Sequence, residues 1–420
     1  MKVLFSPMNV WYIHPYAGGP GVGRYWRPYY FSKFWNEAGH RSMVISAAYH
    51  HLLEPDEARY GMSEKNGVRY GYVPTLKYRG NGMGRMLSML QFSLLLLPFC
   101  LLQALRRGRP DLIIYSSPHP FGVVSAWLGA RLLGAKFVFE VRDIWPLSLV
   151  ELGGLKDSNP MVRLTGWIER FAYKRSDRVI SLLPCAEAHM TEKGLKPSKF
   201  LWVPNGVDIG GELPNIVQED SPFVGHVRRL KEQGCFVVVY AGAHGEPNAL
   251  EGLVRSAKVL EDEGLNVKII LVGKGERKAQ LMAYADEASL DLVEFFDQQP
   301  KESVMMALRL ASAGYISLKA QPIFRFGVSP NKLWDYMLVK LPVIFACKAG
   351  NDPVGDYGCG VTADPDDPKS IAQAITYLYH LTEAERSAMG QRGYDAVLKN
   401  YTYEQLASRI VQTLGSQRDA

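Results

Sequence analysis

Short apolar runs alternate with helical patterns along most of the 420-residue chain. Continuous apolar strands separated by helices are typical of parallel sheets that are covered on both faces. In the first half the apolar runs are Val3–Ser6, Ser42–Ser46, Leu112–Ser116, Phe137–Val141 and Arg178–Leu182. In the second half they are Phe236–Tyr240, Val267–Val272, Leu292–Phe296, Gly314–Leu318 and Val343–Ala346. These two sets of about five strands predict an α/β protein with two Rossmann-like, doubly wound parallel-sheet domains.

The boundary between the two domains is expected near Phe200–Asp208, which reads FLWVPNGVD and contains a Pro-Asn-Gly turn. We therefore assign residues 1–205 to a first domain and residues 206–400 to a second. The irregular and then charged stretch Ile209–Gly234 fits a linker followed by an entry helix. The last helix, about Tyr403–Leu414, is expected to pack back on the first domain.

Composition narrows the class of protein. The chain is 47% hydrophobic and 21% charged, which is typical of a folded globular protein. A net charge of +6 fits an anionic ligand or an anionic membrane surface, although a solvated surface with a small excess of Lys and Arg explains it equally well. No zinc-finger spacing, basic-region helix or aromatic RNA-binding pattern is present, so a nucleic-acid partner is not expected.

The five cysteines and the first residues indicate a cellular compartment. The cysteines are scattered without a CxxC pair, which is typical of a reducing cytoplasm where most of them pack as small apolar residues. The opening MKVLFSP reads as a buried first strand and not as a signal peptide.

One segment departs from the soluble pattern. Met86–Leu105 reads MLSMLQFSLLLLPFCLLQAL and has arginines on both sides. Its length allows a membrane-spanning helix, but it carries Ser, Gln and Pro and lies between two strands of one sheet. A buried core helix and an interfacial helix, with leucines in lipid and arginines at the headgroups, are the two other interpretations.

The second half carries a candidate phosphate site at Ser329–Lys332, which reads SPNK. Ser is a good helix N-cap and Pro is favoured at the first helical position, so a helix is predicted to begin here. The N-terminus of such a helix can hold a diphosphate, and Lys332 adds a full charge. Asp335, one turn further on, can accept two hydrogen bonds from a ribose diol. An ordinary capped helix with an exposed acid is the structural alternative.

Two glycine-bearing strand ends of the second half are expected to lie beside this helix. Leu271–Lys278 reads LVGKGERK, where Gly273 and Gly275 allow close approach of the backbone and Lys278 can reach a phosphate. Tyr240–Leu250 reads YAGAHGEPNAL and offers His244 and Asn248. Each motif alone is a weak signal, but ligands of open α/β sheets bind beyond the carboxyl ends of the strands, where these loops converge.

The first half has three polar strand ends. Tyr16–Pro28 contains four glycines in six residues, but it starts too far from the expected first strand for a dinucleotide fingerprint. His119 follows one strand in SSPHP, and Arg142 and Asp143 follow another in EVRDIWP. A histidine in such a loop is more often a surface residue than a catalyst, and an Arg-Asp pair can be purely structural.

The chain carries no motif of a metalloenzyme or of a serine hydrolase. No HExxH, paired HxH or Asp-x-Asp pattern appears, and no GxSxG elbow or Walker A lysine. We therefore expect no catalytic metal and no cofactor.

Taken together, these motifs resemble glycosyltransferase family 4, the retaining nucleotide-sugar transferases of GT-B fold. The resemblance covers nearly the whole chain and is closest to bacterial enzymes of O-antigen, capsule or colanic-acid synthesis, notably the N-acetylfucosaminyl (aminosugar) branch. It is carried by the Gly18–Gly23 loop, AGH at Ala38–His40, SSPHPFG, FEVRDIWPLSLVELG, VPNGVD, YAGAHG, VGKGERK and GVSPNKLWDYMLVKLPVI.

The resemblance implies two domains facing each other across a cleft, with the donor, usually a UDP-sugar, bound by the second domain and the acceptor by the first. It implies catalytic roles for His119, Arg142, Asp143 and Lys332. It implies donor contacts from Gly19, Gly21, Gly242, His244, Gly245, Asn248, Gly273, Gly275, Lys278, Gly327, Val328, Ser329, Lys332 and Asp335.

The chain departs from the family pattern at three places. The family's two acids, eight residues apart, map onto Gly327 and Asp335, and Gly327 cannot contact sugar hydroxyls with a carboxylate. We expect backbone N–H groups around Gly327–Ser329 to replace it. Where many members carry Arg and Lys for the diphosphate, this chain has Ala243-His244 and Asn248, so Lys278 and Lys332 must supply the charge. Arg142-Asp143 stands where His-Asp is frequent, which places the usual first-domain histidine in doubt.

The resulting hypothesis is metal-independent, retaining transfer of a HexNAc or deoxy-aminosugar from a UDP-sugar to a polyprenyl-diphosphate-linked saccharide. The protein would be cytoplasmic and peripheral on the inner face of the bacterial plasma membrane, with Met86–Leu105 as its contact. The acceptor would approach near Gly19–Gly21, His119 and Asp143. The alternatives are a GT-B-fold UDP-sugar epimerase and a non-catalytic sugar-nucleotide-binding protein, whose only support is the missing first acid.

Overall fold

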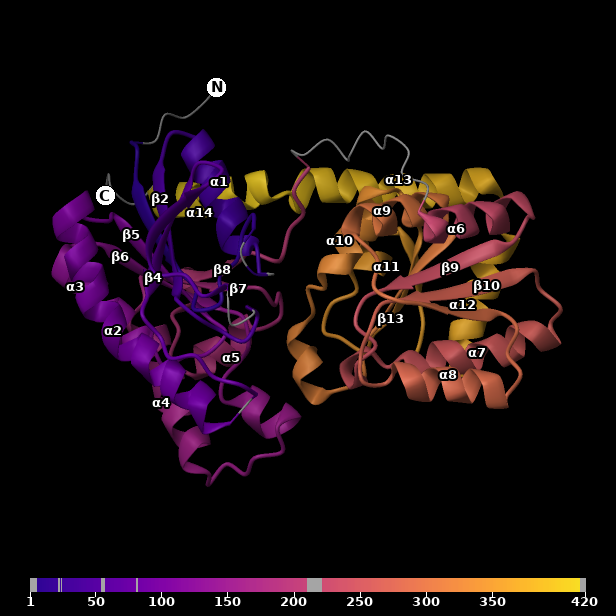
Figure 1. Cartoon of the computed structure of the whole chain (residues 1–420), viewed down its shortest axis with the longest axis horizontal. Coiled ribbons are helices and arrows are strands. Elements are labelled where there is room, and N and C mark those ends of the chain that lie inside the picture. Colours follow the sequence, from indigo (N-terminus) through magenta and orange to yellow (C-terminus); the bar gives the residue numbers. More distant parts are fainter. Residues whose placement is uncertain are drawn as a thin grey trace. The chain divides into compact units, whose positions relative to one another are not determined.

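The structure is a computed structural model that describes residues 6–21, 23, 25–53, 57–80, 82–209 and 221–415. The chain divides into two compact units. The first comprises residues 1–206 together with the C-terminal residues 403–420, and the second comprises residues 207–402. Figure 1 is coloured along the sequence, and the yellow C-terminal helix α14 belongs to the first unit.

The first unit is built on an eight-stranded sheet in the order β3-β4-β2-β1-β5-β6-β7-β8. Only the β3–β4 pair is antiparallel, and the described partners of every other pair run parallel. The strands are β1 Asn9–Ile13, β2 Arg41–Ala47, β3 Gly61–Lys65, β4 Val68–Val73, β5 Leu112–Ser117, β6 Lys136–Val141, β7 Arg178–Ser181 and β8 Phe200–Trp202.

Helices cover both faces of this sheet. The helices are α1 Arg27–Glu37, α2 Met83–Arg107, α3 Val123–Leu133, α4 Pro160–Arg175, α5 Glu187–Glu192 and α14 Tyr403–Gly415, with short turns at Ser148–Leu152 and Pro197–Lys199. The last helix, α14, packs on α1, where the indole N–H of Trp35 donates to the carbonyl of Ala407 at 2.9 Å. Their apolar side chains form one core with β1, β5, β6 and β7.

The second unit is an all-parallel sheet in the order β11-β10-β9-β12-β13-β14. Its strands are β9 Phe236–Ala241, β10 Val267–Val272, β11 Val293–Phe296, β12 Ala313–Ser317, β13 Val343–Ala346 and β14 Gly360–Thr362. This is a doubly wound order, in which the strands are added to one side of β9 first and then, from β12 onward, to its other side. Ligands of such sheets bind beyond the carboxyl ends of the strands, at the point where the strand order reverses.

The helices of the second unit flank its sheet on both sides. They are α6 Pro222–Glu232, α7 Leu250–Asp262, α8 Lys278–Glu287, α9 Lys301–Leu310, α10 Asn331–Leu338, α11 Pro353–Tyr357, α12 Pro368–His380 and α13 Glu383–Asn400, with short turns at Glu246–Asn248 and Pro322–Phe326. A continuous core of strand and helix side chains holds the unit together.

The described residues form more strands than the ten that the sequence predicted. The strand expected at Val3–Ser6 lies outside the described residues except for Ser6, which is not in a strand, and the first described strand is Asn9–Ile13. The glycine loop of Tyr16–Pro28 therefore follows a strand closely. Four further strands were missed because β3 and β4 form a polar, glycine-bearing hairpin and β8 and β14 have only three residues each.

The apolar segment expected at Met86–Leu105 is the longer helix α2, Met83–Arg107. Among the described residues it is the helix long and apolar enough to cross a membrane by length and composition. One side of α2 is buried against α3 and β4, so it is also an integral part of the first unit.

Candidate functional site

The candidate donor site of the second unit lies at the carboxyl ends of β9 and β10. Gly273 allows these loops to interlock, because a Cβ there would lie 1.9 Å from the carbonyl oxygen of Gly242. A Cβ on Gly275 would lie 2.4 Å from the carbonyl of His244. The backbone of His244 in turn donates to Lys274 at 2.9 Å. The predicted glycines Gly242, Gly273 and Gly275 therefore do bring the two loops together, with Gly245 and Asn248 continuing the first loop.

Lys332 reaches this loop from the first turn of α10. Its ammonium donates to the hydroxyl of Tyr240 at 2.7 Å and to the side-chain oxygen of Asn248 at 3.3 Å, and it lies 4.0 Å from the centre of the Tyr240 ring. A Cβ on Gly242 would lie only 2.8 Å from the same nitrogen. Burial lowers the pKa of Lys332 to about 8, so the ammonium is still mostly charged at neutral pH.

His244 lies beside this cation with its ring fully buried. Neither ring nitrogen has a hydrogen-bond partner among the described residues. Burial, followed by the charges of Lys278 and Lys332, lowers its pKa to about 4. His244 is therefore a neutral imidazole beside a cationic site, able to donate one hydrogen bond to a ligand.

Asp335 lies one turn further along α10 and is 24% exposed. Burial raises the pKa of its carboxyl, and Lys301, whose ammonium lies 3.4 Å away at the start of α9, acts in the opposite direction. Lys301 carries no local signal in the sequence, because its partner lies on another helix. Asp335 keeps the position and the acceptor oxygens that a ribose diol requires.

Ser329 does not cap the helix as predicted. The described helix α10 begins at Asn331 with Pro330 as the capping residue, and no side chain caps it. Ser329 therefore lies in the preceding turn, although the N-terminus of α10 still points its positive dipole end toward this loop region.

The backbone N–H groups expected to replace the missing acid are already engaged. The N–H of Gly327 donates to the carbonyl of Phe324 at 2.9 Å. The N–H of Val328 donates to the side-chain oxygen of Asn351 at 2.7 Å, and the Asn351 amide donates back to the Val328 carbonyl at 3.1 Å. The N–H groups of Gly327 and Val328 are therefore paired within the protein, which disfavours the prediction for these two residues. Gly327 has a φ of +93°, a backbone conformation that an acid adopts only with strain.

Lys278 is also committed elsewhere. Its ammonium donates to the carbonyls of Gly273 and Phe296 at 3.3 and 2.9 Å and pairs with the carboxylate of Asp297 at 2.6 Å. These contacts hold the ends of β10 and β11 together. The ammonium of Lys278 is therefore engaged within the protein, whereas that of Lys332 reaches the loop after β9, and the predicted phosphate contact of Lys278 stays a prediction.

The first unit has a second cluster, at the carboxyl ends of β1, β2 and β5. His14, His50 and His119 follow these strands and are each at most 2% exposed. The ring of Tyr16 lies between them, 6.3, 5.5 and 5.7 Å from their centres. Only His119 was singled out from the sequence, because the other two carry no motif.

These histidines are neutral hydrogen-bond donors. Burial is the main cause that lowers the pKa of His14 well below its ordinary value and the pKa of both His50 and His119 to about 3. Backbone N–H groups donate to Nδ1 of His14 and of His50, which places the proton of each ring on Nε2. Within the described residues neither Nε2 has a partner, and neither does either nitrogen of His119. His119 is thus a poor base at neutral pH but a competent donor.

Arg142 and Asp143 follow β6 beside this cluster. The guanidinium of Arg142 lies 4.1 Å from the centre of the Tyr25 ring. The ring of His14 also stacks on the Tyr25 ring, with ring centres 4.2 Å apart. Burial lowers the pKa of Arg142, and Asp143 opposes that shift. Burial raises the pKa of Asp143 and Arg142 lowers it. The structure thus brings His119, Arg142 and Asp143 to one edge of the sheet.

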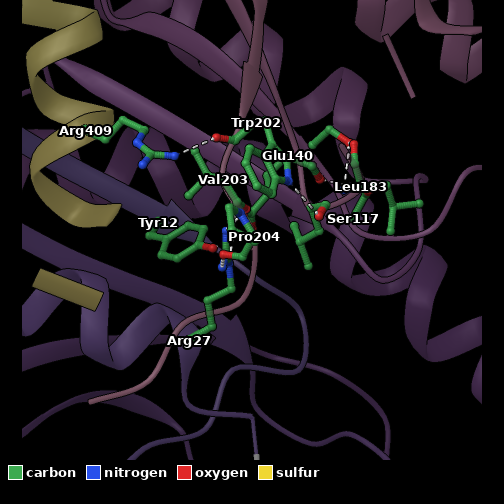
Figure 2. A network of polar contacts seen from close by, with 11 residues as sticks. Tyr12, Arg27, Ser117, Glu140, Leu183, Trp202, Val203, Pro204 and Arg409 are labelled. Carbon is green, nitrogen blue, oxygen red and sulfur yellow. Dashed lines mark hydrogen bonds and ion pairs between the residues drawn. The ribbon is translucent and has the colours of Figure 1, made fainter. Parts of the chain in front are cut away.

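A buried ion pair supports this edge from behind (Figure 2). Arg27, at the start of α1, pairs with Glu140 at 2.8 Å, and Tyr12 donates to the same carboxylate at 2.5 Å. The guanidinium also donates to the carbonyls of Val203 and Pro204 at 2.9 and 2.5 Å. Glu140 is two residues from Arg142, so this network fixes the end of β6. This network carries no signal in the sequence, because its members are far apart in the chain.

Gly19 and Gly21 lie in the loop after β1 and make different demands. A Cβ on Gly19 would lie 2.1 Å from the hydroxyl of Tyr70, so a side chain is excluded there. Gly21 has a φ of +69° and open space around its Cα.

Within the described residues, no group of three His, Cys, Asp or Glu side chains is placed to hold a metal ion.

Both units match known protein families. Residues 21–206 match the family described as "Glycosyl transferase 4-like domain", and residues 235–380 match "Glycosyl transferases group 1". The chain is therefore made of two glycosyltransferase domains, as the resemblance in sequence implied.

Two curated relatives share most of the chain at low identity. The probable glycosyltransferase WbjE of Pseudomonas aeruginosa is 23% identical over 300 residues, which are 71% of this chain and 72% of WbjE. The putative colanic acid biosynthesis glycosyl transferase WcaI of Escherichia coli K12 is 25% identical over 311 residues, which are 71% of this chain and 75% of WcaI.

Solved structures define the fold. A sucrose-phosphate synthase from Thermosynechococcus elongatus aligns over 97% of this chain and 98% of its own, with a TM-score of 0.72 and 15% identity. HepE from Anabaena, in complex with UDP-glucose, aligns over 97% of this chain and 100% of its own, with a TM-score of 0.64 and 15% identity. WaaG, a glycosyltransferase of lipopolysaccharide biosynthesis, aligns over 96% and 99% with a TM-score of 0.62 and 12% identity. The chain has the GT-B fold, as predicted.

Proposed function

We propose that this protein is a retaining glycosyltransferase of bacterial surface polysaccharide synthesis. It transfers a HexNAc or deoxy-aminosugar from a UDP-sugar to a polyprenyl-diphosphate-linked saccharide, without a metal, at the inner face of the plasma membrane. The single observation that carries the proposal is the placement of Lys332. A charged ammonium and the N-terminus of α10 meet at the carboxyl edge of a doubly wound sheet, one turn before Asp335.

The donor half of the site follows from charge and position. The diphosphate of UDP would lie against the N-terminus of α10 and Lys332, with His244 and Asn248 as further polar partners. Asp335 would accept hydrogen bonds from the ribose hydroxyls. HepE was solved with UDP and with UDP-glucose, which supports a uridine nucleotide as the donor for this chain too.

The chemical step is a substitution at C1 of the sugar. As the bond between C1 and the UDP oxygen lengthens, positive charge develops on the sugar and negative charge on the departing diphosphate. Lys332 and the helix N-terminus stabilise that negative charge in the transition state. The acceptor hydroxyl forms the new bond to C1 on the face that UDP leaves, and its proton passes to the departing phosphate. A strong protein base is then unnecessary, in agreement with the low pKa of His119.

The acceptor half belongs to the first unit. The neutral donors His14, His50 and His119, together with Arg142 and Asp143, offer groups that donate to and accept from sugar hydroxyls. The similarity to WcaI, a putative glycosyl transferase of colanic acid biosynthesis, favours a bacterial polysaccharide pathway. The outer side of α2 favours an acceptor that is carried in a membrane.

Thermal unfolding in EDTA with UDP, GDP and a panel of UDP-sugars tests the donor site. A ligand that binds only the folded state raises the midpoint. We expect a shift with UDP, a larger one with one UDP-HexNAc, and loss of both shifts in Lys332→Ala and Asp335→Ala. Lys369→Ala, an exposed lysine on α12, is the matched control and should keep the shifts.

Turnover separates the alternatives. Transfer of the sugar to a lipid-linked acceptor supports the transferase. Conversion of the UDP-sugar into its epimer without acceptor would support an epimerase instead. If UDP raises the unfolding midpoint but neither reaction occurs with any acceptor tested, the result would support a non-catalytic sugar-nucleotide-binding protein.

A further inference from the structure

The exposed side of α2 is apolar, unlike that of an ordinary surface helix. The side chains buried against the rest of the unit are Phe92, Leu96, Cys100 and Ala104 together with the polar Ser88, Ser93 and Gln103. The exposed side is apolar and carries a stripe of leucines: Leu87, Leu90, Leu94, Leu102 and Leu105. Successive leucines of this stripe are three or four residues apart, except for the gap of eight between Leu94 and Leu102. Leu94 and Leu105 are 75% and 86% exposed. Water is an unfavourable neighbour for such a stripe.

The inner side of α2 is firmly attached to the unit. The hydroxyl of Ser125 on α3 donates to the carbonyl of Ser93 at 2.6 Å. The ring of Phe99 packs where a side chain at Gly71 of β4 would be, 2.9 Å from its Cβ position. These contacts require α2 to lie along the domain, so its leucine stripe faces outward as a fixed surface and does not depend on helix release.

Cations surround the leucine stripe and extend over two more helices. α2 contacts α3, and α3 contacts α4. Figure 1 shows the three helices along one side of the first unit. Their exposed cations are Arg106, Arg107, Arg131, Arg163, Arg170, Lys174 and Arg175. These three fully described helices contain one acid, Glu169, which is buried and bonded to His189.

On α4 the cations share a stripe with an aromatic ring. Arg163, Trp167, Arg170 and Lys174 are four, three and four residues apart, so they lie on one side of the helix. Trp167 is 51% exposed and stacks on Phe171 with ring centres 5.5 Å apart. Exposed tryptophan beside cations is typical of the boundary between headgroups and acyl chains.

We propose that the outward side of α2, α3 and α4, which we call the α2–α4 face, docks on a lipid surface that carries negative charge. The leucine stripe enters the headgroup–acyl boundary, Trp167 lies at the level of the headgroups, and the cations bind anionic lipids. The complete lack of exposed carboxylates on the three helices supports an anionic partner, and the leucines distinguish a lipid surface from a purely charged partner. The inference deepens the proposed function, on which its biological meaning rests, because it places the first domain where a lipid-linked acceptor is found.

Co-sedimentation of the purified full chain with vesicles tests this docking without any turnover. One set of vesicles contains phosphatidylglycerol and the other is pure phosphatidylcholine. Each cation close to an anionic surface strengthens binding by about fivefold. We expect binding to the phosphatidylglycerol vesicles at least tenfold stronger than to the neutral ones, and weaker binding as salt is added.

Two variants divide the face into its charged and apolar parts. Arg163→Gln/Arg170→Gln should weaken binding to anionic vesicles by about tenfold or more. Leu94→Gln/Leu105→Gln should weaken it similarly, with a residual salt-sensitive component. Lys231→Gln/Arg309→Gln and Tyr377→Gln, which remove exposed cations and an exposed ring from the second unit, are the matched controls and should bind like the unchanged protein.

Several results would overturn the proposal. They are no binding of the unchanged protein to either vesicle, equal binding to both, or full binding by both face variants. A dimer in light scattering that Leu94→Gln/Leu105→Gln dissociates, with no vesicle binding, would assign the face to a second copy. All variants should keep the UDP-induced thermal shift. If the unchanged protein shows this shift but binds neither vesicle, only the docking is contradicted, and if it binds anionic vesicles but shows no shift with any uridine nucleotide, only the proposed function is contradicted.

Discussion

The ammonium of Lys332 lies 2.7 Å from the hydroxyl of Tyr240, joining the first turn of α10 to the end of β9. The family that the chain resembles usually carries its diphosphate cations in the loop after this strand, where the chain has Ala243 and Asn248. Here the positive charge of Lys332 reaches the same loop from helix α10. The glycine at position 242 is required for this arrangement, because a side chain there would meet the lysine.

Affinity for UDP should therefore depend on pH through Lys332. Its pKa is lowered to about 8 by burial, so the charge that attracts the diphosphate is lost as pH rises above 8. We expect the affinity to fall between pH 8 and 9.5, by at most about tenfold per pH unit for one titrating group. Isothermal titration calorimetry measures it, in a range where the second pKa of a phosphate, near 6, has no influence. Lys332→Arg keeps its charge and should remove the fall, and the same fall in that variant would contradict the assignment.

The same lowered pKa predicts an opposite effect on the unliganded protein. The folded-state pKa of about 8 lies below the ordinary value of 10.5, so holding the ammonium charged costs stability at every pH below 8. That cost decreases as pH rises from 8 to 10.5, because the folded state loses its proton first. Lys332→Met should therefore raise the free energy of unfolding at pH 7 without ligand, with the gain declining toward pH 10.5, while UDP binding is lost. Urea titrations at several pH values measure this, and a stability difference that grows with pH would be the wrong sign.

An acid placed at position 327 should not restore the family pattern. Gly327 has a φ of +93°, and backbone strain of this kind costs roughly 1–3 kcal/mol for a residue with a side chain. We expect Gly327→Glu to be less stable in urea and to gain no transfer activity. Gly327→Ala carries the same strain without the carboxylate and is the control. A Gly327→Glu protein that is as stable as the original and more active would show that the loop adapts and that the acid was simply missing.

The fold could be predicted from the sequence because buried parallel strands are written as continuous apolar runs. Nine of the ten expected runs coincide with strands, as at β9 and β10, where Val, Ile and Leu follow one another. The hairpin of β3 and β4 was missed since its outer strand, GMSEK, has a half-exposed surface and no apolar run. Helix α2 was found, but only the three-dimensional packing could show that Ser88 and Ser93 face inward while Leu94 and Leu105 face outward.

The candidate site was predictable in its motifs and not in its contacts. Asp335 and Lys332 stand in one short motif, and glycines at strand ends mark where a backbone must come close. Lys278 and Lys332 look equivalent in sequence, yet Asp297 and two carbonyls engage the first while the second reaches Tyr240 and Asn248. Asn351, which holds both backbone polar groups of Val328, has no local signal because its partner is 23 residues away.

Lys301 and Asp335 should contribute very differently to nucleotide binding, although they form one ion pair. The pair is 3.4 Å long and Lys301 is 68% exposed, and surface pairs of this kind are worth about 0–1 kcal/mol. We expect Lys301→Ala to change the Kd for UDP by less than about fivefold. Asp335→Ala removes the acceptor for the ribose diol and should weaken UDP by more than about tenfold, since a hydrogen bond to a charged group is worth about 1.5–3 kcal/mol. Equal losses in the two variants would indicate that the pair merely supports the fold.

The buried pair of Arg27 and Glu140 should be essential to the stability of the first unit. Both side chains are 1% exposed, and Arg27 also donates to the carbonyls of Val203 and Pro204. Removing one partner leaves the other charge buried and unpaired, which typically costs about 3–5 kcal/mol. We expect Arg27→Met to lower the free energy of unfolding by about that amount, as measured by urea denaturation of the full chain. Arg27→Met/Glu140→Leu removes both charges and should recover part of the loss, whereas Tyr12→Phe, which removes one hydrogen bond, should cost about 1–2 kcal/mol. If the double variant is no more stable than the single one, the carbonyl contacts of Arg27 and not its charge hold this edge of the sheet in place.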